Sequence, residues 1–135
     1  MQVRVQHLGD FKFQASARGH ATVCDQPASN GGSDSGMTPP EFLLTALGTC
    51  AGFYAAQYLK NHSLSCEGLE VAVSAEKVRP PVRLGNFQID VFVPGLKPED
   101  EAGVFRAVHA CLIHNTLAHP PAIETVIHAA VPLPV

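Results

Sequence analysis

The sequence contains little charge, and its positive charges are not clustered. Charged residues make up 16% of the 135 residues, with nine Lys and Arg against twelve Asp and Glu, which gives a formal net charge of -3. Nucleic acid and anionic lipid are bound through grouped cations that neutralise phosphates. We therefore expect neither nucleic acid nor a membrane surface as a partner.

Sequence signatures of several other protein classes are missing. Residues 1–10 alternate polar and apolar side chains without the apolar core of a signal peptide, so we expect a cytoplasmic protein. No GxSxG motif occurs, and the Gly31-Gly32 pair lacks the Lys and Ser or Thr of a phosphate-binding loop. These absences argue against a serine hydrolase and against a nucleotide site.

The four cysteines form no recognisable framework. They include no CxxC pair and no zinc-ribbon spacing, and a reducing compartment keeps ordinary structural pairs open. Cys111 and His114 could supply two ligands to a metal, but no spacing recommends the third and fourth. We expect no disulfide scaffold, no metal and no cofactor; a Cys111–His114 metal site is kept as the weakest alternative.

One uncharged stretch, residues 42–59, is long enough for a membrane span to be considered. Two threonines, two glycines and a glutamine dilute it, and alanine supplies much of the rest. A helix that is apolar on all sides is also typical of a protein core. We interpret this stretch as a core helix.

The hydrophobic periodicity predicts one α+β domain over residues 1–135, with helices packed on antiparallel sheet. Thr38 can cap a helix, Pro39 suits its first position, and Glu41 can close a capping box onto Thr38. The expected elements are strands near 3–7, 11–15 and 20–24, a flexible connector over 26–37, a helix from 38 to about 60, strands over 68–77 and 86–94, a helix from 98 to 115 and a closing strand over 123–131.

Cys50 and Cys111 each lie within one of the two expected helices. Cys50 shares a face with Leu43, Leu47, Tyr54 and Tyr58, and a face of smaller residues (Leu44, Gly48, Ala51, Ala55) could receive another helix. Apolar surroundings raise a thiol pKa, whereas the reactive form is the thiolate. Without a nearby cation both cysteines would be inert packing residues. The candidate cations are Arg4, Arg18, Arg83 and Arg106, of which Arg18, on a turn before a strand, is the easiest to bring over a helix.

The other two cysteines receive no function. We interpret Cys24 as part of a strand core and Cys66 as a surface or edge residue.

Three segments taken together resemble the OsmC/Ohr family. They are Gly19-His20-Ala21 with Asp25 and the Gly-rich loop, the run from Thr38 to Cys50, and the run from Cys111 to Leu117. The stretch Pro40 to Cys50 is the most specific, and a second cysteine follows 61 residues later in the next helix, as in the family. The resemblance spans nearly the whole chain.

The resemblance implies an OsmC-like fold, in which antiparallel sheets wrap around two central helices of an intertwined homodimer. It also implies a peroxidase of the oxidative stress response that reduces organic hydroperoxides. Cys50 would attack the peroxide and become a sulfenic acid, Cys111 would resolve it to a disulfide, and a dithiol reductant would restore both. The family's activating Arg and Glu map to Arg18 and Glu41.

Two departures separate this chain from the organic-hydroperoxide branch of the family. Leu112-Ile113 stands where that branch usually has Pro and Tyr, and the spacing from Glu41 to Cys50 is one residue shorter. The chain therefore resembles the broader OsmC-like group, whose members are less uniformly peroxidases.

The alternative is a non-catalytic dimer of this fold that binds a small hydrophobic ligand, with redox-sensitive cysteines. Apolar residues around Cys50 favour a hydrophobic substrate.

Helix geometry constrains the role of Glu41. Nine residues of ideal helix place Glu41 roughly 13 Å from Cys50 and on the opposite side. Glu41 therefore cannot meet Cys50 of its own chain within one straight helix. We expect Glu41 or Arg18 to reach the cysteine of the second subunit.

Overall fold

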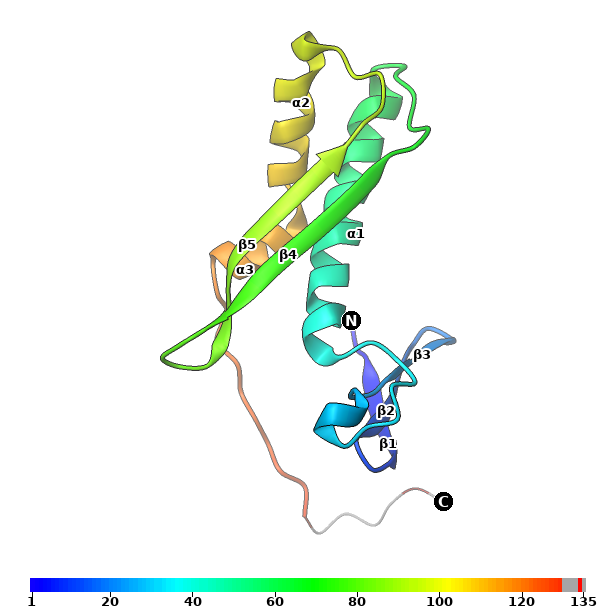
Figure 1. Ribbon diagram of the computed structural model, residues 1–135, viewed down its shortest axis with the longest axis vertical. Coiled ribbons are helices and arrows are strands. Elements are labelled where there is room, and N and C mark those ends of the chain that lie inside the picture. The colour runs from blue at the N-terminus through cyan, green and yellow to red at the C-terminus, as the bar shows by residue number, and fades with distance from the viewer. Residues whose placement is uncertain (130–133, 135) are drawn as a thin grey trace.

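The computed structural model describes residues 1–129 and 134. Within them lie two antiparallel sheets and three α-helices, so the α+β prediction is confirmed (Figure 1). One sheet has the order β1-β2-β3 and the other pairs β4 with β5. The elements are β1 (Arg4–Gly9), β2 (Lys12–Ala17), β3 (His20–Cys24), a short 3-10 turn (Ala28–Asn30), α1 (Pro39–Asn61), β4 (Glu70–Val78), β5 (Arg83–Phe92), α2 (Pro98–His109) and α3 (Leu112–Ala118).

The long helix α1 begins where its capping residues predict. The Thr38 hydroxyl accepts the backbone N–H of Glu41 at 3.5 Å and donates to Glu41 Oε1 at 3.0 Å. The carboxylate thus contacts the capping hydroxyl, whereas in a capping box it would accept the backbone N–H of Thr38. Pro39 occupies the first helical position, where its missing N–H is not needed.

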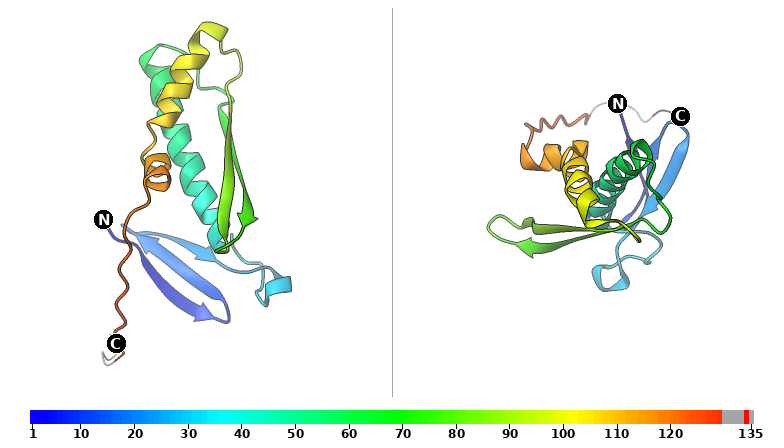
Figure 2. Two further views of the ribbon diagram at one scale, coloured as in Figure 1. Left: turned by 90° about the vertical axis from the view of Figure 1, so that its left-hand side faces the viewer. Right: turned by 90° about the horizontal axis from the view of Figure 1, so that it is seen from above.

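The core lies between α1, α2 and the β4–β5 sheet (Figure 2). The buried side of α1 carries one residue from each turn, and α2 adds two valines: the buried set is Leu47, Ala51, Ala55, Leu59, Val104 and Val108. The sequence instead predicted that the face containing Cys50 would be the core face. Of that face only Leu47 is fully buried, because the small residues of α1 turn toward the sheet and α2.

The two glycines of α1 allow a strand, rather than another helix, to approach closely. A Cβ at Gly48 would lie 3.1 Å from Val73 Cγ2, and one at Gly52 would lie 3.6 Å from Val71 Cγ2. Both valines belong to β4. The small-residue side of α1 was therefore correctly predicted as a site of close packing: the helix α2 packs against Ala51 and Ala55, and β4 approaches the two glycines.

The loop between β3 and α1 is fixed by Asp25 rather than being a flexible connector. Asp25 is 1% exposed, and its carboxylate accepts the N–H groups of Gln26, Ser33 and Ser35 and the Ser35 hydroxyl. The Ser35 hydroxyl, with these N–H groups, lowers the pKa of Asp25 from 3.8 to about 2. The loop thereby sets the direction in which the chain enters α1.

The sheet β1–β3 lies beyond the N-terminal end of α1, away from β4–β5 (Figure 1). Its apolar side chains are not covered by this chain, since Val5, Leu8, Phe11 and Phe13 are all exposed. The sheet therefore presents apolar surface that a single chain leaves in contact with water.

The closing strand predicted over residues 123–131 is wrong for its described part. Residues 123–129 form no strand, and Ile123 and Ile127 are 85% and 81% exposed; residues 130 and 131 lie outside the described residues. A strand needs a neighbouring strand to pair its backbone N–H and C=O groups. Within the described chain this segment has none.

Helix α1 is also long and apolar enough to cross a membrane by length and composition. Its 18-residue window has a mean hydropathy of 1.2, and 22% of that window is buried inside the chain. A membrane span and a core helix that a second chain covers would both be apolar and largely uncovered by their own chain. The interpretation of α1 as a core helix therefore stays a prediction.

Candidate active site

The two cysteines singled out from the sequence lie next to each other. Cys50 is half-buried in the middle of α1, and Cys111, at the junction of α2 and α3, is 0% exposed. The thiol of Cys50 lies close enough to that of Cys111 to raise the pKa of Cys111. All four cysteines are free. The fold therefore assembles a reduced dithiol from distant parts of the chain.

Cys111 does not lie inside a helix, as the sequence predicted, but at a break between two. The expected helix over 98–115 ends as α2 at His109, and Cys111 is the N-cap of α3 with φ -55° and ψ 130°. Its Sγ accepts the backbone N–H of His114 at 3.4 Å. The sulfur thereby takes the place of the hydroxyl or carboxylate that usually caps a helix. Apolar periodicity continues across the break, so the sequence pattern did not show it.

The surroundings of Cys111 keep its thiol protonated. Burial raises the pKa of Cys111 above its ordinary 9.0, and the neighbouring Cys50 raises it further. The N–H groups of His114 and Ile113 oppose this rise without overcoming it. Cys111 is therefore a thiol at neutral pH, and it needs a proton acceptor before it can act as a nucleophile.

Two histidines lie beside the dithiol, and sequence reasoning did not pair them. The rings of His109 and His114 have centroids 4.9 Å apart, and Phe105 stacks on His109 at 4.2 Å. Nδ1 of His114 is buried without a hydrogen-bond partner. A continuous helix would place residues five apart on different faces. The break at Cys111 brings the two rings together.

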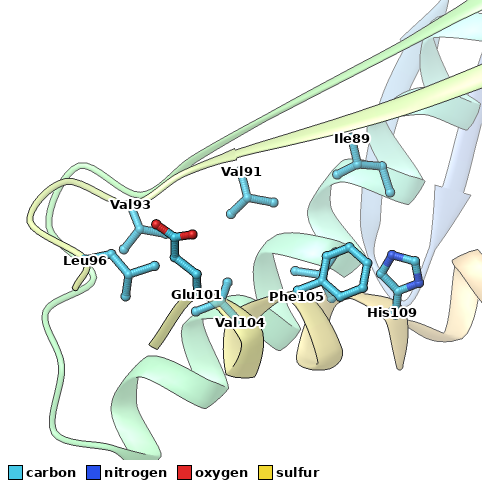
Figure 3. A pocket seen from close by; sticks show the side chains of 9 residues that line it. Ile89, Val91, Val93, Leu96, Glu101, Val104, Phe105 and His109 are labelled. Atoms are coloured by element: carbon cyan, nitrogen blue, oxygen red, sulfur yellow. The ribbon is translucent and has the colours of Figure 1, made fainter. Parts of the chain in front are cut away.

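Two apolar cavities adjoin this group. The first, about 400 Å³, lies between β5 and α2, with Ile89 and Val91 on one side and Val104 and Phe105 on the other (Figure 3). The second, about 370 Å³, is lined by Leu47, Phe87, Ile89, His109, His114, Leu117 and Ala118. Ile89 and His109 line both. Neither cysteine lines this second cavity, but two of its lining residues are neighbours of the cysteines: Leu47 precedes Cys50 by one helical turn, and the N–H of His114 is bound to Cys111.

The structure does not bring the other two predicted site residues to Cys50 within one chain. Arg18 is exposed on the turn between β2 and β3, and Glu41 is exposed at the start of α1. Among the described residues, Glu41 bonds to Thr38 and Arg18 has no hydrogen bond. Their predicted roles at the cysteine of a second subunit stay predictions.

The remaining sequence candidates are placed as follows. Cys66, expected at the surface or an edge, is half-buried against the core, and its thiol donates to the carbonyl of Ala56 at 3.7 Å. Cys24 is half-buried at the end of β3. In the described part of the chain, no three His, Cys, Asp or Glu side chains are arranged to hold a metal ion.

The fold is of the α+β class, with helices packed on antiparallel sheet. Its two neighbouring cysteines, one on the long helix α1 and one at the α2–α3 junction, form a candidate redox site. A family model of OsmC-like proteins matches residues 32–126. The chain belongs to the OsmC-like family. The resemblance noted in the sequence is thus confirmed.

Solved structures share this fold. A Psychrobacter arcticus protein with proposed roles in osmotic stress and detoxification superimposes with a TM-score of 0.78 at 18% identity, covering 86% of this chain and 87% of that one. An OsmC-like protein from Mycoplasma pneumoniae gives 0.72 at 18% identity, with 88% and 87% covered. An organic hydroperoxide resistance protein from Legionella pneumophila gives 0.66 at 13% identity, with 87% and 89% covered. The curated proteins contain no match to this chain.

Proposed function

We propose that this protein is a thiol-dependent peroxidase that reduces organic hydroperoxides through Cys50 and Cys111. The observation that carries the proposal is the contact between a half-buried thiol on α1 and a fully buried thiol at the α2–α3 junction. The more accessible thiol is the one that can meet a substrate. The buried one can reach only its neighbour, which is the role of a resolving cysteine.

The proposed reaction uses the two thiols in order. The Cys50 thiolate attacks one oxygen of ROOH, the O–O bond breaks, and with one proton the products are Cys50 sulfenic acid and ROH. The Cys111 thiol then attacks the sulfur of Cys50, which gives a disulfide and water. A dithiol reductant returns both cysteines to thiols and is itself oxidised to a disulfide.

The apolar walls beside the dithiol support an organic rather than an inorganic peroxide. Phe87, Ile89 and Leu47 line the cavity of about 370 Å³, together with His114, whose N–H is bound to Cys111. An apolar substituent gains free energy by entering such a site, whereas hydrogen peroxide has none to bury. The Legionella pneumophila protein of the same fold is called an organic hydroperoxide resistance protein, which agrees with this choice.

The proposed active form is a homodimer. The chain exposes 10293 Å², whereas a compact monomer of its mass exposes about 6,800 Å². Part of the excess belongs to the extended C-terminal segment, and part to exposed apolar side chains of β1–β3 and α1, including Phe53 at 60%. A second chain would cover this surface. It would also bring its Arg18 and Glu41 to Cys50, where the arginine would favour the thiolate.

Hydroperoxide consumption tests the proposal. Purified protein is mixed with cumene hydroperoxide and dithiothreitol, and the peroxide is measured over time for wild type, Cys50→Ser and Cys111→Ser. Wild type should turn over, and Cys50→Ser should be inactive. Cys111→Ser should react once and accumulate a sulfenic acid that dimedone traps. Equal inactivity of all three proteins would remove the peroxidase proposal.

A second measurement tests the proposed activators. Arg18→Ala should raise the pKa of the Cys50 thiol, which is followed by the pH dependence of alkylation by iodoacetamide. Glu41→Gln should slow the first oxidation step. Arg4→Ala, which removes a cation of the same sheet, serves as the control. If Arg18→Ala is alkylated with the wild-type pH dependence, Arg18 does not activate Cys50.

The two apolar cavities also favour a second candidate function, the binding of a small hydrophobic ligand without catalysis. Together they are bordered by Phe87, Ile89 and Val91 of β5 and by Val93 just beyond its end, and a cavity of several hundred Å³ suits a drug-sized molecule. Titration with the fluorescent probe 1-anilinonaphthalene-8-sulfonate would detect such binding. Saturable binding by a protein that does not consume hydroperoxide would favour this candidate.

A further inference from the structure

The resolving step needs a proton acceptor close to a thiol that is sealed from solvent. Cys111 is 0% exposed, so water does not reach its sulfur directly. No carboxylate, Lys or Arg is among the described residues lining the adjoining cavity, whose titratable groups are His109 and His114. From α1 the cysteine meets Cys50, and β5 contributes Phe87 and Ile89, which carry no charge.

His114 occupies the position from which a side chain can serve the capping residue. It is the third residue of α3, and its own N–H is bound to the Cys111 sulfur at 3.4 Å. A side chain at this position can turn back toward the N-cap, as the Glu of a capping box does. The backbone of His114 therefore lies at the Cys111 sulfur, and its imidazole, whose buried Nδ1 has no hydrogen bond to that sulfur in this structure, can turn toward it.

The ring of His114 joins the buried interior to the cavity. Its Nδ1 is buried and has no hydrogen-bond partner, although a buried imidazole nitrogen usually has one. Other atoms of the residue line the cavity of about 370 Å³, and the ring of His109 follows at 4.9 Å between centroids. His109 is exposed, so this pair connects the interior to solvent.

We propose that His114 accepts the proton of Cys111 when Cys111 attacks oxidised Cys50, and that His109 passes this proton toward the cavity. This inference rests on the proposed function. In the resolving step the Cys111 S–H bond breaks and the Cys50–Cys111 S–S bond forms. The Cys50 S–O bond breaks, and the departing hydroxide takes a proton from water in the cavity, to which His109 delivers the proton of Cys111, and leaves as water. The histidines are unchanged at the end of the step.

The proton transfer can be tested without any peroxide. In a Cys24→Ser/Cys66→Ser background, 2,2'-dipyridyl disulfide reacts first with Cys50 and releases one pyridine-2-thione. Cys111 then attacks the mixed disulfide and releases a second. The first release reports the reactivity of Cys50, and the second reports the nucleophilicity of Cys111. The two phases are measured by stopped-flow absorbance as a function of pH.

His114→Asn retains a hydrogen-bonding side chain but cannot take up a proton at neutral pH. We expect the second release to slow about 100-fold at pH 7, at the lower end of what general base catalysis contributes. The first release should not change. The rate in the variant should rise steadily with pH, whereas the wild-type rate levels off once the imidazole is neutral. Added imidazole should restore part of the rate in His114→Ala.

His119→Asn is the matched control, because His119 is an exposed histidine at the end of the same helix and should leave both phases unchanged. His109→Asn, an exposed position, tests the relay even if His114→Asn fails to fold, and we expect a slower second release. A wild-type second phase and pH profile in His114→Asn would overturn the proposal. A wild-type second phase in His109→Asn would overturn the relay.

The same experiment separates this inference from the proposed function. If wild type does not consume hydroperoxide but its second phase depends on His114, the peroxidase proposal fails and the proton transfer stands. If hydroperoxide is consumed and His114→Asn resolves at the wild-type rate, the peroxidase proposal stands and the inference fails.

Discussion

The side chain of Cys50 contacts the thiol of Cys111, which lies 61 residues further along the chain. One cysteine belongs to the longest helix of the fold and the other caps its shortest. Because α1 contacts both α2 and α3, this pair joins the core helix to the last helical segment. Oxidation of the pair would therefore cross-link the middle of α1 to the start of α3.

Mild oxidation should convert Cys50 and Cys111 into a disulfide within one chain. Because a loop of about 60 residues would be closed, the oxidised protein should gain up to about 4 kcal/mol in its free energy of unfolding. Urea unfolding of the oxidised and reduced forms, with peptide mapping by mass spectrometry, checks both statements. Cys24→Ser/Cys66→Ser should behave as wild type. A disulfide that contains Cys24 or Cys66 would contradict the assignment.

Acid should destabilise the protein in a pH range set by Asp25. Its pKa is 3.8 unfolded and about 2 folded, so the stabilisation is fully present above pH 4 and is lost as the pH falls toward 2. Asp25→Asn should be less stable than wild type at neutral pH and should lack this part of the acid sensitivity. Urea unfolding at pH 7, 4, 3 and 2 measures the difference.

Asp34→Asn is the control for the Asp25 prediction, since Asp34 is an exposed carboxylate in the same loop. It should keep the wild-type pH dependence. If Asp25→Asn and wild type lost stability in parallel over this range, Asp25 would not be the group that titrates.

Gly103→Ala should destabilise the protein, because Gly103 is buried on α2 and the added Cβ would overlap the Tyr58 hydroxyl and ring. Overpacking of this kind costs about 1–3 kcal/mol. Tyr58→Phe should relieve part of the loss in the double variant, because the hydroxyl is the nearest atom to the new methyl group. Thermal and urea unfolding of the four proteins gives the coupling energy. Additive effects would show that the two sites do not meet.

The protein should sediment as a dimer with twice the monomer mass of 14.3 kDa. Ile127→Asp should weaken the dimer, because Ile127 is an exposed apolar residue that we expect the second chain to cover. Thr125→Asp introduces the same charge at a neighbouring exposed position and should have a smaller effect. Sedimentation velocity over a range of concentrations measures both. A wild-type monomer at high micromolar concentration would remove the dimer proposal.

The limits of helices and strands were predicted well where they depend on residues close together in the sequence. The start of α1 follows from Thr38, Pro39 and Glu41, which lie within four residues of each other. The five strands follow from alternation, although β5 begins three residues earlier than expected, at Arg83. Family membership could also be predicted, because the run from Pro40 to Cys50 and the later cysteine are recognisable in order.

The sequence could not show which face of α1 is buried. Leu47 lies on the face of Cys50 and Ala51 lies on the face of small residues, yet both are buried, because burial depends on the side from which β4 and α2 approach. The sequence also could not show how the residues of the candidate site are arranged in space. The sequence shows that His109 and His114 flank Cys111, but the proximity of their rings follows from a helix break rather than from spacing along one helix.

The sequence by itself determined the α+β class, the limits of the long helix and the two cysteines worth examining, because capping, alternation and residue type act over a few positions. Only the tertiary structure decided that Cys111 caps a new helix, that its thiol lies next to Cys50, and that a buried His114 nitrogen has no hydrogen-bond partner. It also left residues 123–129 without a strand partner. These outcomes depend on contacts between segments far apart in the chain, and burial rather than local propensity selects them.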